Sequence, residues 1–124
     1  MSGTLQSLHG TPVFVCADDG EPLRTARDAL DVIGEAGYLG ADWVALPAAR
    51  LADDFFQLRT GVAGEIVQKF ANYRLRLAVL GDVSRHTAAS TALRDFVREC
   101  DRGNQLWFLP DLAALGGRLA AAAG

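Results

Sequence analysis

The stretch Asp54–Asp82, DFFQLRTGVAGEIVQKFANYRLRLAVLGD, decides the fold that we expect for this chain. Apolar residues recur at helical spacing through its first part: Phe55, Leu58, Val62, Ile66 and Phe70. This stripe predicts one long amphipathic helix. The second part, at residues 75–80, begins in alternation and ends fully apolar, which is typical of a buried strand. The stretch therefore predicts a long helix that leads into a strand of a covered sheet.

The same alternation of strand and helix continues on both sides of this stretch. Short apolar runs predict strands at residues 12–17, 42–46 and 106–109, and a weaker strand at residues 4–8 is expected to form a hairpin through His9-Gly10. The first helix is expected to begin at Pro22, with Asp19 or Gly20 as its cap, and to end at Gly34 and Gly37. Another helix is expected from Ser90 to residue 102, and a last one after Pro110-Asp111. The pattern predicts an α/β fold with a mainly parallel sheet of four to five strands, helices packed on it and an N-terminal hairpin.

The composition is that of one globular domain over residues 1–124. Half of the residues are hydrophobic and 22% are charged, and the net charge of -3 argues against nucleic acid or an anionic membrane as the main partner. We find no signal peptide pattern and no apolar run of the roughly 20 residues that span a bilayer, so a cytoplasmic location is expected. Cys16 and Cys100 are expected to be buried free thiols, with a disulfide or a reactive cysteine as the alternative.

Several short motifs stand out between Val13 and Leu109. They are Leu58-Arg59-Thr60-Gly61, Ala63-Gly64-Glu65-Ile66, Gln68-Lys69-Phe70, Asn72-Tyr73-Arg74 and Gly81-Asp82. With these motifs the chain resembles the bacterial family known as domain of unknown function 4180, whose name implies no reaction. Members of that family often carry Asn before the Arg-Gly of a later motif, where this chain has Asp101.

The order of the expected elements adds a second, more distant resemblance. A hairpin, a helix–strand alternation and a final strand–Pro–Asp–helix unit are similar to the STAS domain, which sulphate transporters and anti-sigma-factor antagonists share. In that domain a Ser or Thr at the start of the second helix, often followed by Gly, is a phosphorylation switch. Thr60-Gly61 falls near that position. The resemblance thus implies a STAS-like fold and makes Thr60 a candidate for phosphorylation.

The long helix carries glycines and polar side chains away from its apolar stripe. Gly61, Gly64 and Gln68 share one face, and each helix glycine costs about 1 kcal/mol relative to alanine. That cost indicates either close approach by a ligand or partner, or tight packing inside the protein. The candidate binding residues lie along this helix, with one on the next helix: Arg59, Thr60, Gly61, Gly64, Glu65, Gln68, Asn72 and Arg102.

Ionisable groups near the strand ends leave an enzyme as an alternative. Glu65 either pairs with Lys69 or acts as a general base, and a catalytic set would then consist of Glu65, Arg59 and Asp82. Its site would lie between the long helix and the carboxyl edge of the sheet, with Asn72 and Arg102 contributing.

Acidic residues gather at the same edge. Asp18, Asp19 and Asp82 follow buried strands and could hold a Mg²⁺-type cation, but turn formation and capping explain them as well. We expect no metal and no cofactor, because no ligand spacing or nucleotide-binding motif is present. His86, in a polar loop at residues 84–87, is expected to be solvated.

A third group of charges repeats every four residues on the helix after Ser90. Arg94, Arg98 and Arg102 alternate there with Asp95 and Glu99. The pattern is typical of a solvated, ion-paired face, and the alternative is a binding surface for an acidic partner or ligand.

Two functions follow from these features. We predict a regulatory module that binds a protein partner, or a second copy of itself, through the long second helix. The alternative is a small-molecule-binding protein or small enzyme with a polar site between that helix and the strand edge.

Overall fold

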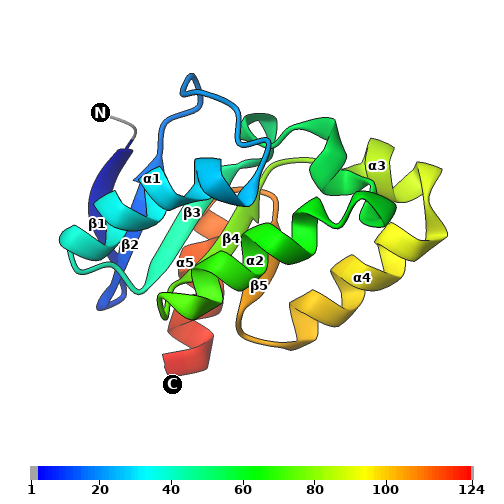
Figure 1. The fold of residues 1–124 in the computed structure, drawn as a ribbon. Helices are drawn as coiled ribbons and strands as arrows, with labels where there is room; N and C mark the ends of the chain where they lie inside the picture. Colours follow the sequence, from blue (N-terminus) through cyan, green and yellow to red (C-terminus); the bar gives the residue numbers. More distant parts are fainter. Residues whose placement is uncertain (1–2, 124) are drawn as a thin grey trace.

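A five-stranded sheet forms the centre of the computed structural model, which describes residues 3–123 (Figure 1). The strands lie in the order of the sequence: β1 (Gly3–Leu8), β2 (Thr11–Cys16), β3 (Trp43–Pro47), β4 (Arg76–Leu80) and β5 (Leu106–Leu109). The first two are antiparallel and the other neighbours are parallel. The mainly parallel α/β sheet and the N-terminal hairpin are therefore confirmed. The hairpin turns at His9 and Gly10, whose φ angles of 52° and 86° fit a two-residue turn.

Three helices cover one face of the sheet, and one helix covers the other. α1 (Ala26–Tyr38), α2 (Val62–Asn72) and α4 (Thr91–Arg102) lie in front of the sheet in Figure 1, and α5 (Leu112–Ala123) lies behind it. Each parallel connection steps to the next strand in the same direction, and right-handed crossovers of that kind place their helices on one face. The carboxyl ends of β2 to β5 consequently meet at one edge of the sheet.

The two faces of the sheet bury separate apolar layers. The layer under the three helices includes Phe14, Val44 and Leu77 of the sheet, all fully buried. On the opposite face, Trp43 and Trp107 lie with their ring centroids 4.3 Å apart. They come from β3 and β5, and Ala78 of the intervening β4 stands opposite Trp107. A small residue at that position leaves room for the two indole rings, which α5 then covers with Leu115 and Leu119.

The second helix is shorter than the sequence predicts. Phe55 and Leu58 belong to two 3-10 turns, η2 (Asp53–Phe56) and η3 (Leu58–Thr60), and α2 begins only at Val62. Gly61 has a φ of 77°, a left-handed conformation that ends one helical segment before the next begins. The prediction of one continuous helix from Phe55 onwards was therefore wrong, although Phe55, Ile66 and Phe70 are buried as expected.

The first helix also begins and ends later than expected. Thr25 caps α1 in place of Asp19 or Gly20: its hydroxyl accepts a hydrogen bond from Asp28 N (3.3 Å), and the Asp28 carboxylate accepts one from Thr25 N (3.2 Å). This reciprocal capping box fixes the start of the helix. Gly34 and Gly37 do not end it, because α1 continues through both to Tyr38.

Other element boundaries follow local signals. Ser90 caps α4 as predicted, with its hydroxyl accepting from Leu93 N at 3.1 Å, and Asp111 caps α5 through Ala114 N at 2.9 Å. The polar loop after β4 is instead a short helix, α3 (Ser84–Ala89), which begins where the Asp82 carboxylate accepts from Ser84 N.

A buried arginine holds the carboxyl edge together. The side chain of Arg50, in the 3-10 turn η1 (Ala48–Arg50), is only 3% exposed. Its Nε donates to Glu21 O and its guanidinium to Ala17 O, both at 2.9 Å. Gly20 lies so close that a Cβ there would overlap the guanidinium. Arg50 thus ties the segment between β2 and α1 to the end of β3.

Both cysteines are free thiols. Cys16 is buried and Cys100 is partly buried. Burial raises the pKa of Cys16 to about 12 and that of Cys100 to about 11. Among residues 3–123, no helix is long and apolar enough to cross a bilayer.

Candidate functional site

The residues that the sequence singled out do not gather into one pocket. Gly64, Glu65, Gln68 and Asn72 lie exposed on α2, whereas Arg102 lies at the end of α4. The cleft at the strand edge is lined by Asp82 but by none of Arg59, Glu65, Asn72 or Arg102. Of the catalytic set that the sequence proposed, only Asp82 therefore lines this cleft.

The Thr60 hydroxyl stabilises the turns before α2 through hydrogen bonds. Its hydroxyl lies 2.7 Å from Asp54 O and 2.8 Å from Gln57 O, and it accepts from Val62 N at 3.2 Å. One side chain thus joins η2, η3 and the first turn of α2. Phosphorylation would replace the hydrogen that the hydroxyl donates, so a phosphate at Thr60 requires this turn to open.

The charged pairs on the helix surfaces differ from the expected pattern. Glu65 and Lys69 form no ion pair, and on the same helix Gln68 Nε2 donates instead to Asn72 Oδ1 at 2.8 Å. On α4, Arg102 contacts Glu99 at 3.0 Å, and Arg94 lies 4.0 Å from Asp95. Arg98 makes no hydrogen bond or ion pair within residues 3–123.

The glycines inside α1 and α2 face solvent. A Cβ built on Gly34 or Gly37 of α1, or on Gly64 of α2, would meet no atom within 4 Å. Packing inside the protein therefore does not account for these glycines; for Gly64, the alternative that the sequence offered is close approach by a ligand or partner. Gly61 differs from them, because its positive φ by itself calls for glycine.

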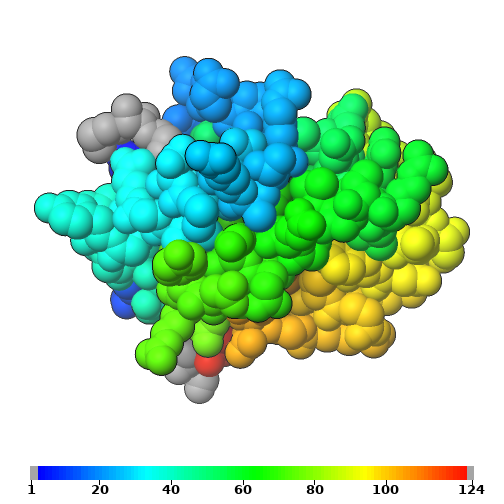
Figure 2. All heavy atoms as spheres, viewed as in Figure 1, coloured from blue at the N-terminus to red at the C-terminus, as the bar shows by residue number. Residues whose placement is uncertain are grey.

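An apolar groove runs between α1 and the end of α2. Its volume is about 430 Å³. We call it the α1–α2 groove, and it is lined by Leu30, Ile33, Gly34, Gly37, Tyr38, Tyr73 and Leu75. Tyr38 is 90% exposed and Tyr73 is 59% exposed, so two aromatic side chains project beside the hollow that the glycines leave. Figure 2 views this side of the molecule, with α1 in cyan beside α2 in green.

A second and larger hollow lies at the carboxyl ends of β4 and β5. This β4–β5 cleft has a volume of about 610 Å³. Its polar lining consists of Asp82, Ser84, Thr87, Arg94, Arg98 and Asp101, and the rest of its wall is formed by apolar residues and glycine. In open α/β sheets, ligands bind at this edge.

Local hydrogen bonds engage both carboxylates of the β4–β5 cleft. Asp82 accepts from Ser84 N at 2.8 Å, and hydrogen bonds from the Ser84 side chain and backbone lower the pKa of Asp82. Asp101 Oδ1 accepts from Phe108 N at 2.8 Å. Each carboxylate thus already accepts one backbone hydrogen bond, and neither forms an ion pair with Arg94 or Arg98 within residues 3–123.

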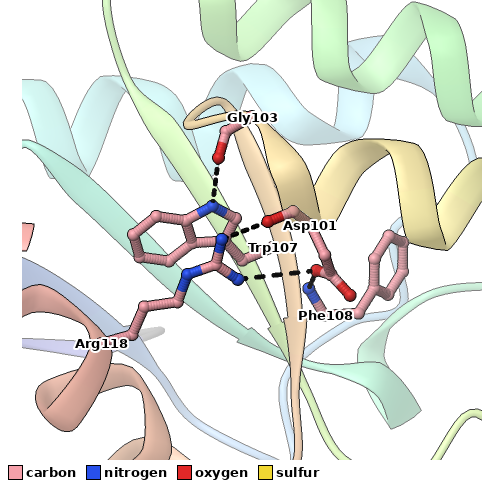
Figure 3. A network of polar contacts seen from close by, with 5 residues as sticks. All are labelled: Asp101, Gly103, Trp107, Phe108 and Arg118. Atoms are coloured by element: carbon pink, nitrogen blue, oxygen red, sulfur yellow. Dashed lines mark hydrogen bonds and ion pairs between the residues drawn. The ribbon is translucent and has the colours of Figure 1, made fainter.

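Asp101 is also the centre of a contact between α4, β5 and α5 (Figure 3). The Arg118 guanidinium donates to the main-chain oxygen of Asp101, lies 4.0 Å from its carboxylate and stacks 3.9 Å from the Trp107 ring centroid. Trp107 Nε1 donates to Gly103 O at 2.7 Å. Asp101 and Gly103, from the Asp101-Arg102-Gly103 motif, thus hold the end of α4 against β5.

A histidine lies between the cleft and η2. His86 stacks on Phe56 with a centroid distance of 4.0 Å, and its Nε2 accepts from Arg85 Nε at 3.3 Å. Burial and the adjacent Arg85 lower the pKa of His86. His86 is thus packed against Phe56 and hydrogen-bonded to Arg85, and is not a freely solvated side chain.

Two of the acidic residues at the sheet edge share a hollow. Asp18 and Asp82 line one hollow together with Arg85 and His86, as parallel strands predict. No group of three or more His, Cys, Asp or Glu side chains within residues 3–123 is arranged to hold a metal ion.

Comparisons with known proteins give a family but no activity. No curated protein and no solved structure matches the chain. The model of the family described as domain of unknown function DUF4180 matches residues 8–119. This match spans most of the chain, and the protein therefore belongs to the DUF4180 family.

Proposed function

We propose that this domain is a protein-interaction module that associates with a second copy of itself through the α1–α2 groove. The observation that carries the proposal is the pair of solvent-facing glycines, Gly34 and Gly37, beside the exposed Tyr38 and Tyr73. Each helix-interior glycine costs about 1 kcal/mol relative to alanine, and no contact within the described chain offsets that cost.

A second copy fits this surface because the surface is self-complementary. A two-fold axis brings the same patch of each subunit together, so a projecting side chain of one copy faces a hollow of the other. Tyr38 projects and Gly34 and Gly37 form a hollow on the same helix. Tyrosine is also a residue that protein interfaces favour, since it buries a large ring and keeps its hydroxyl solvated.

The proposal moves the interface relative to the sequence prediction. The sequence placed it along the second helix and nearby, at Arg59, Thr60, Gly61, Gly64, Glu65, Gln68, Asn72 and Arg102. The α1–α2 groove uses the last turns of α1 and the end of α2 instead, because these are apolar as well as open. A STAS-like fold and a regulatory role belong to the same proposal. The STAS-like fold is supported by the strand order 1-2-3-4-5, the N-terminal hairpin and the Pro110-Asp111 start of the last helix, and the regulatory role is the function that this likeness would imply.

Sedimentation equilibrium of matched glycine variants tests the interface. Gly37→Leu fills the groove, and Gly64→Leu makes the same chemical change on an open helix face outside it. We expect wild type and Gly64→Leu to form dimers and Gly37→Leu to be monomeric. Thermal unfolding at one low concentration checks that both variants fold. A dimer that survives Gly37→Leu, or is lost only in Gly64→Leu, contradicts the proposed interface.

A further inference from the structure

We propose that the β4–β5 cleft binds a small organic anion whose charged group contacts Arg94 and Arg98 and whose apolar body lies against β5. The cleft lies on the opposite side of α2 from the α1–α2 groove, between α4 and the loops that follow β4 and β5. Its volume of about 610 Å³ is within the range of small-molecule sites, roughly 300–1,000 Å³.

The acidic and basic side chains of the cleft differ in the hydrogen bonds and ion pairs that they already make. Asp82 and Asp101 already accept backbone hydrogen bonds at 2.8 Å. By contrast, the Arg98 side chain has no hydrogen bond or ion pair in the described part of the chain, and the only ion pair of Arg94 is the 4.0 Å contact with Asp95. A guanidinium presents five N–H donors and no acceptor. The guanidinium groups of Arg94 and Arg98 therefore keep unused N–H donors for a negatively charged acceptor.

The spacing of the two arginines suits one anionic group. Arg94 and Arg98 are four residues apart on α4, so they lie on the same side of the helix one turn from each other. Two guanidinium groups in that arrangement can share a carboxylate, phosphate or sulfonate, each through charge-assisted hydrogen bonds.

The remaining wall of the cleft selects an apolar body. Val97 of α4 and Phe108, Leu109 and Pro110 of the strand end line it. A simple inorganic anion would leave this surface in contact with water. An aryl or alkyl group attached to the anion would cover it, and burial of apolar surface contributes about 25 cal/mol for each Å².

Paired fluorescent probes test both parts of the site. 8-Anilinonaphthalene-1-sulfonate carries an anionic group on an apolar ring system, and N-phenyl-1-naphthylamine is its neutral counterpart. We expect saturable binding of the sulfonate to the wild type, weakened about tenfold in Arg98→Gln and further in the double variant with Arg94→Gln. Binding of the neutral probe should be weaker in the wild type and equal in all variants.

Two controls separate this site from other surfaces. Arg102→Gln removes a guanidinium one turn further along α4, outside the cleft, and should leave sulfonate binding unchanged. Gly37→Leu fills the α1–α2 groove and should also leave it unchanged, so failure of the proposed interface and failure of this site are distinguishable. Competition by benzoate and by phenyl phosphate then identifies the preferred anionic group.

Any one of three results overturns the proposal. These are unchanged sulfonate affinity in the double variant, equal wild-type affinity for both probes, and loss of sulfonate binding in Gly37→Leu. Amide NMR shifts give an independent location, because Gly81 lines the cleft and Gly40 does not. Titration of the sulfonate should shift the Gly81 signal and leave the Gly40 signal in place.

Discussion

Removing the Asp101 carboxylate should destabilise the protein far more than neutralising it. In Asp101→Ala the Phe108 N–H loses its 2.8 Å acceptor at a buried strand position. A buried donor left without a partner costs about 1–3 kcal/mol. In Asp101→Asn the side-chain oxygen can still accept this hydrogen bond, and only the charge is lost.

The ion pair with Arg118 contributes little to this difference. The two charged groups are 4.0 Å apart, and their side chains are 32% and 33% exposed. Solvent screening at that exposure reduces the contribution to about 0.5 kcal/mol. Alanine also has a higher helix propensity than aspartate, which offsets about 0.5 kcal/mol. We therefore expect a loss of about 2 kcal/mol for Asp101→Ala and about 0.5 kcal/mol for Asp101→Asn.

Urea denaturation followed by tryptophan fluorescence measures both free energies of unfolding. Trp107 lies next to the altered residue in space and packs on Trp43, so its emission reports loss of this part of the fold. Glu99→Ala is a matched control, since it removes an exposed carboxylate from the same helix. A loss in Asp101→Asn as large as that in Asp101→Ala would refute the assignment of the stability to the hydrogen bond.

Three further experiments probe Arg50, Thr60 and the two cysteines. Arg50→Met leaves the carbonyls of Ala17 and Glu21 without donors, so thermal unfolding should show a loss of about 2–3 kcal/mol; a loss below about 0.5 kcal/mol would contradict the anchoring role. Thr60→Val should lower the free energy of unfolding, measured in urea, by about 1 kcal/mol, whereas Thr60→Ser keeps the hydroxyl contacts. Equal stability of the two variants would contradict a contribution from these hydrogen bonds. Burial raises the thiol pKa of Cys16 to about 12 and that of Cys100 to about 11. Both thiols should therefore react with a disulfide reagent at pH 8 only after denaturant is added. Rapid labelling of the native protein would contradict this, because it would show accessible thiolates.

Elements with local signals could be predicted from the sequence. The His9-Gly10 turn, the Ser90 cap and the apolar run at residues 106–109 each lie within a few residues of the structure that they specify. Two short segments were not predicted correctly, because no local signal in the sequence specifies them. α3 has no apolar periodicity, and the spacing of Phe55 and Leu58 is the same whether the segment forms an α-helix or two 3-10 turns.

The candidate sites depended on tertiary contacts that the sequence does not reveal. Helical spacing placed Arg94, Arg98 and Arg102 in one row, but only the structure distinguishes Arg102, which pairs with Glu99, from Arg98, which has no ion pair within residues 3–123. In the same way, Gly34 and Gly37 look like a helix end in the sequence, whereas the fold places them inside α1 and open to solvent. Arg50 escaped notice because nothing near it in the sequence indicates a buried cation.

Intermolecular contacts across the α1–α2 groove test the proposed association most directly. NMR of a mixture of isotope-labelled and unlabelled protein detects only nuclear Overhauser effects between different copies. We predict such effects between the Tyr38 ring of one copy and the Cα protons of Gly34 and Gly37 of the other. Their absence at a concentration where the protein is dimeric, or effects only to the Gly64 side of α2, would contradict the interface.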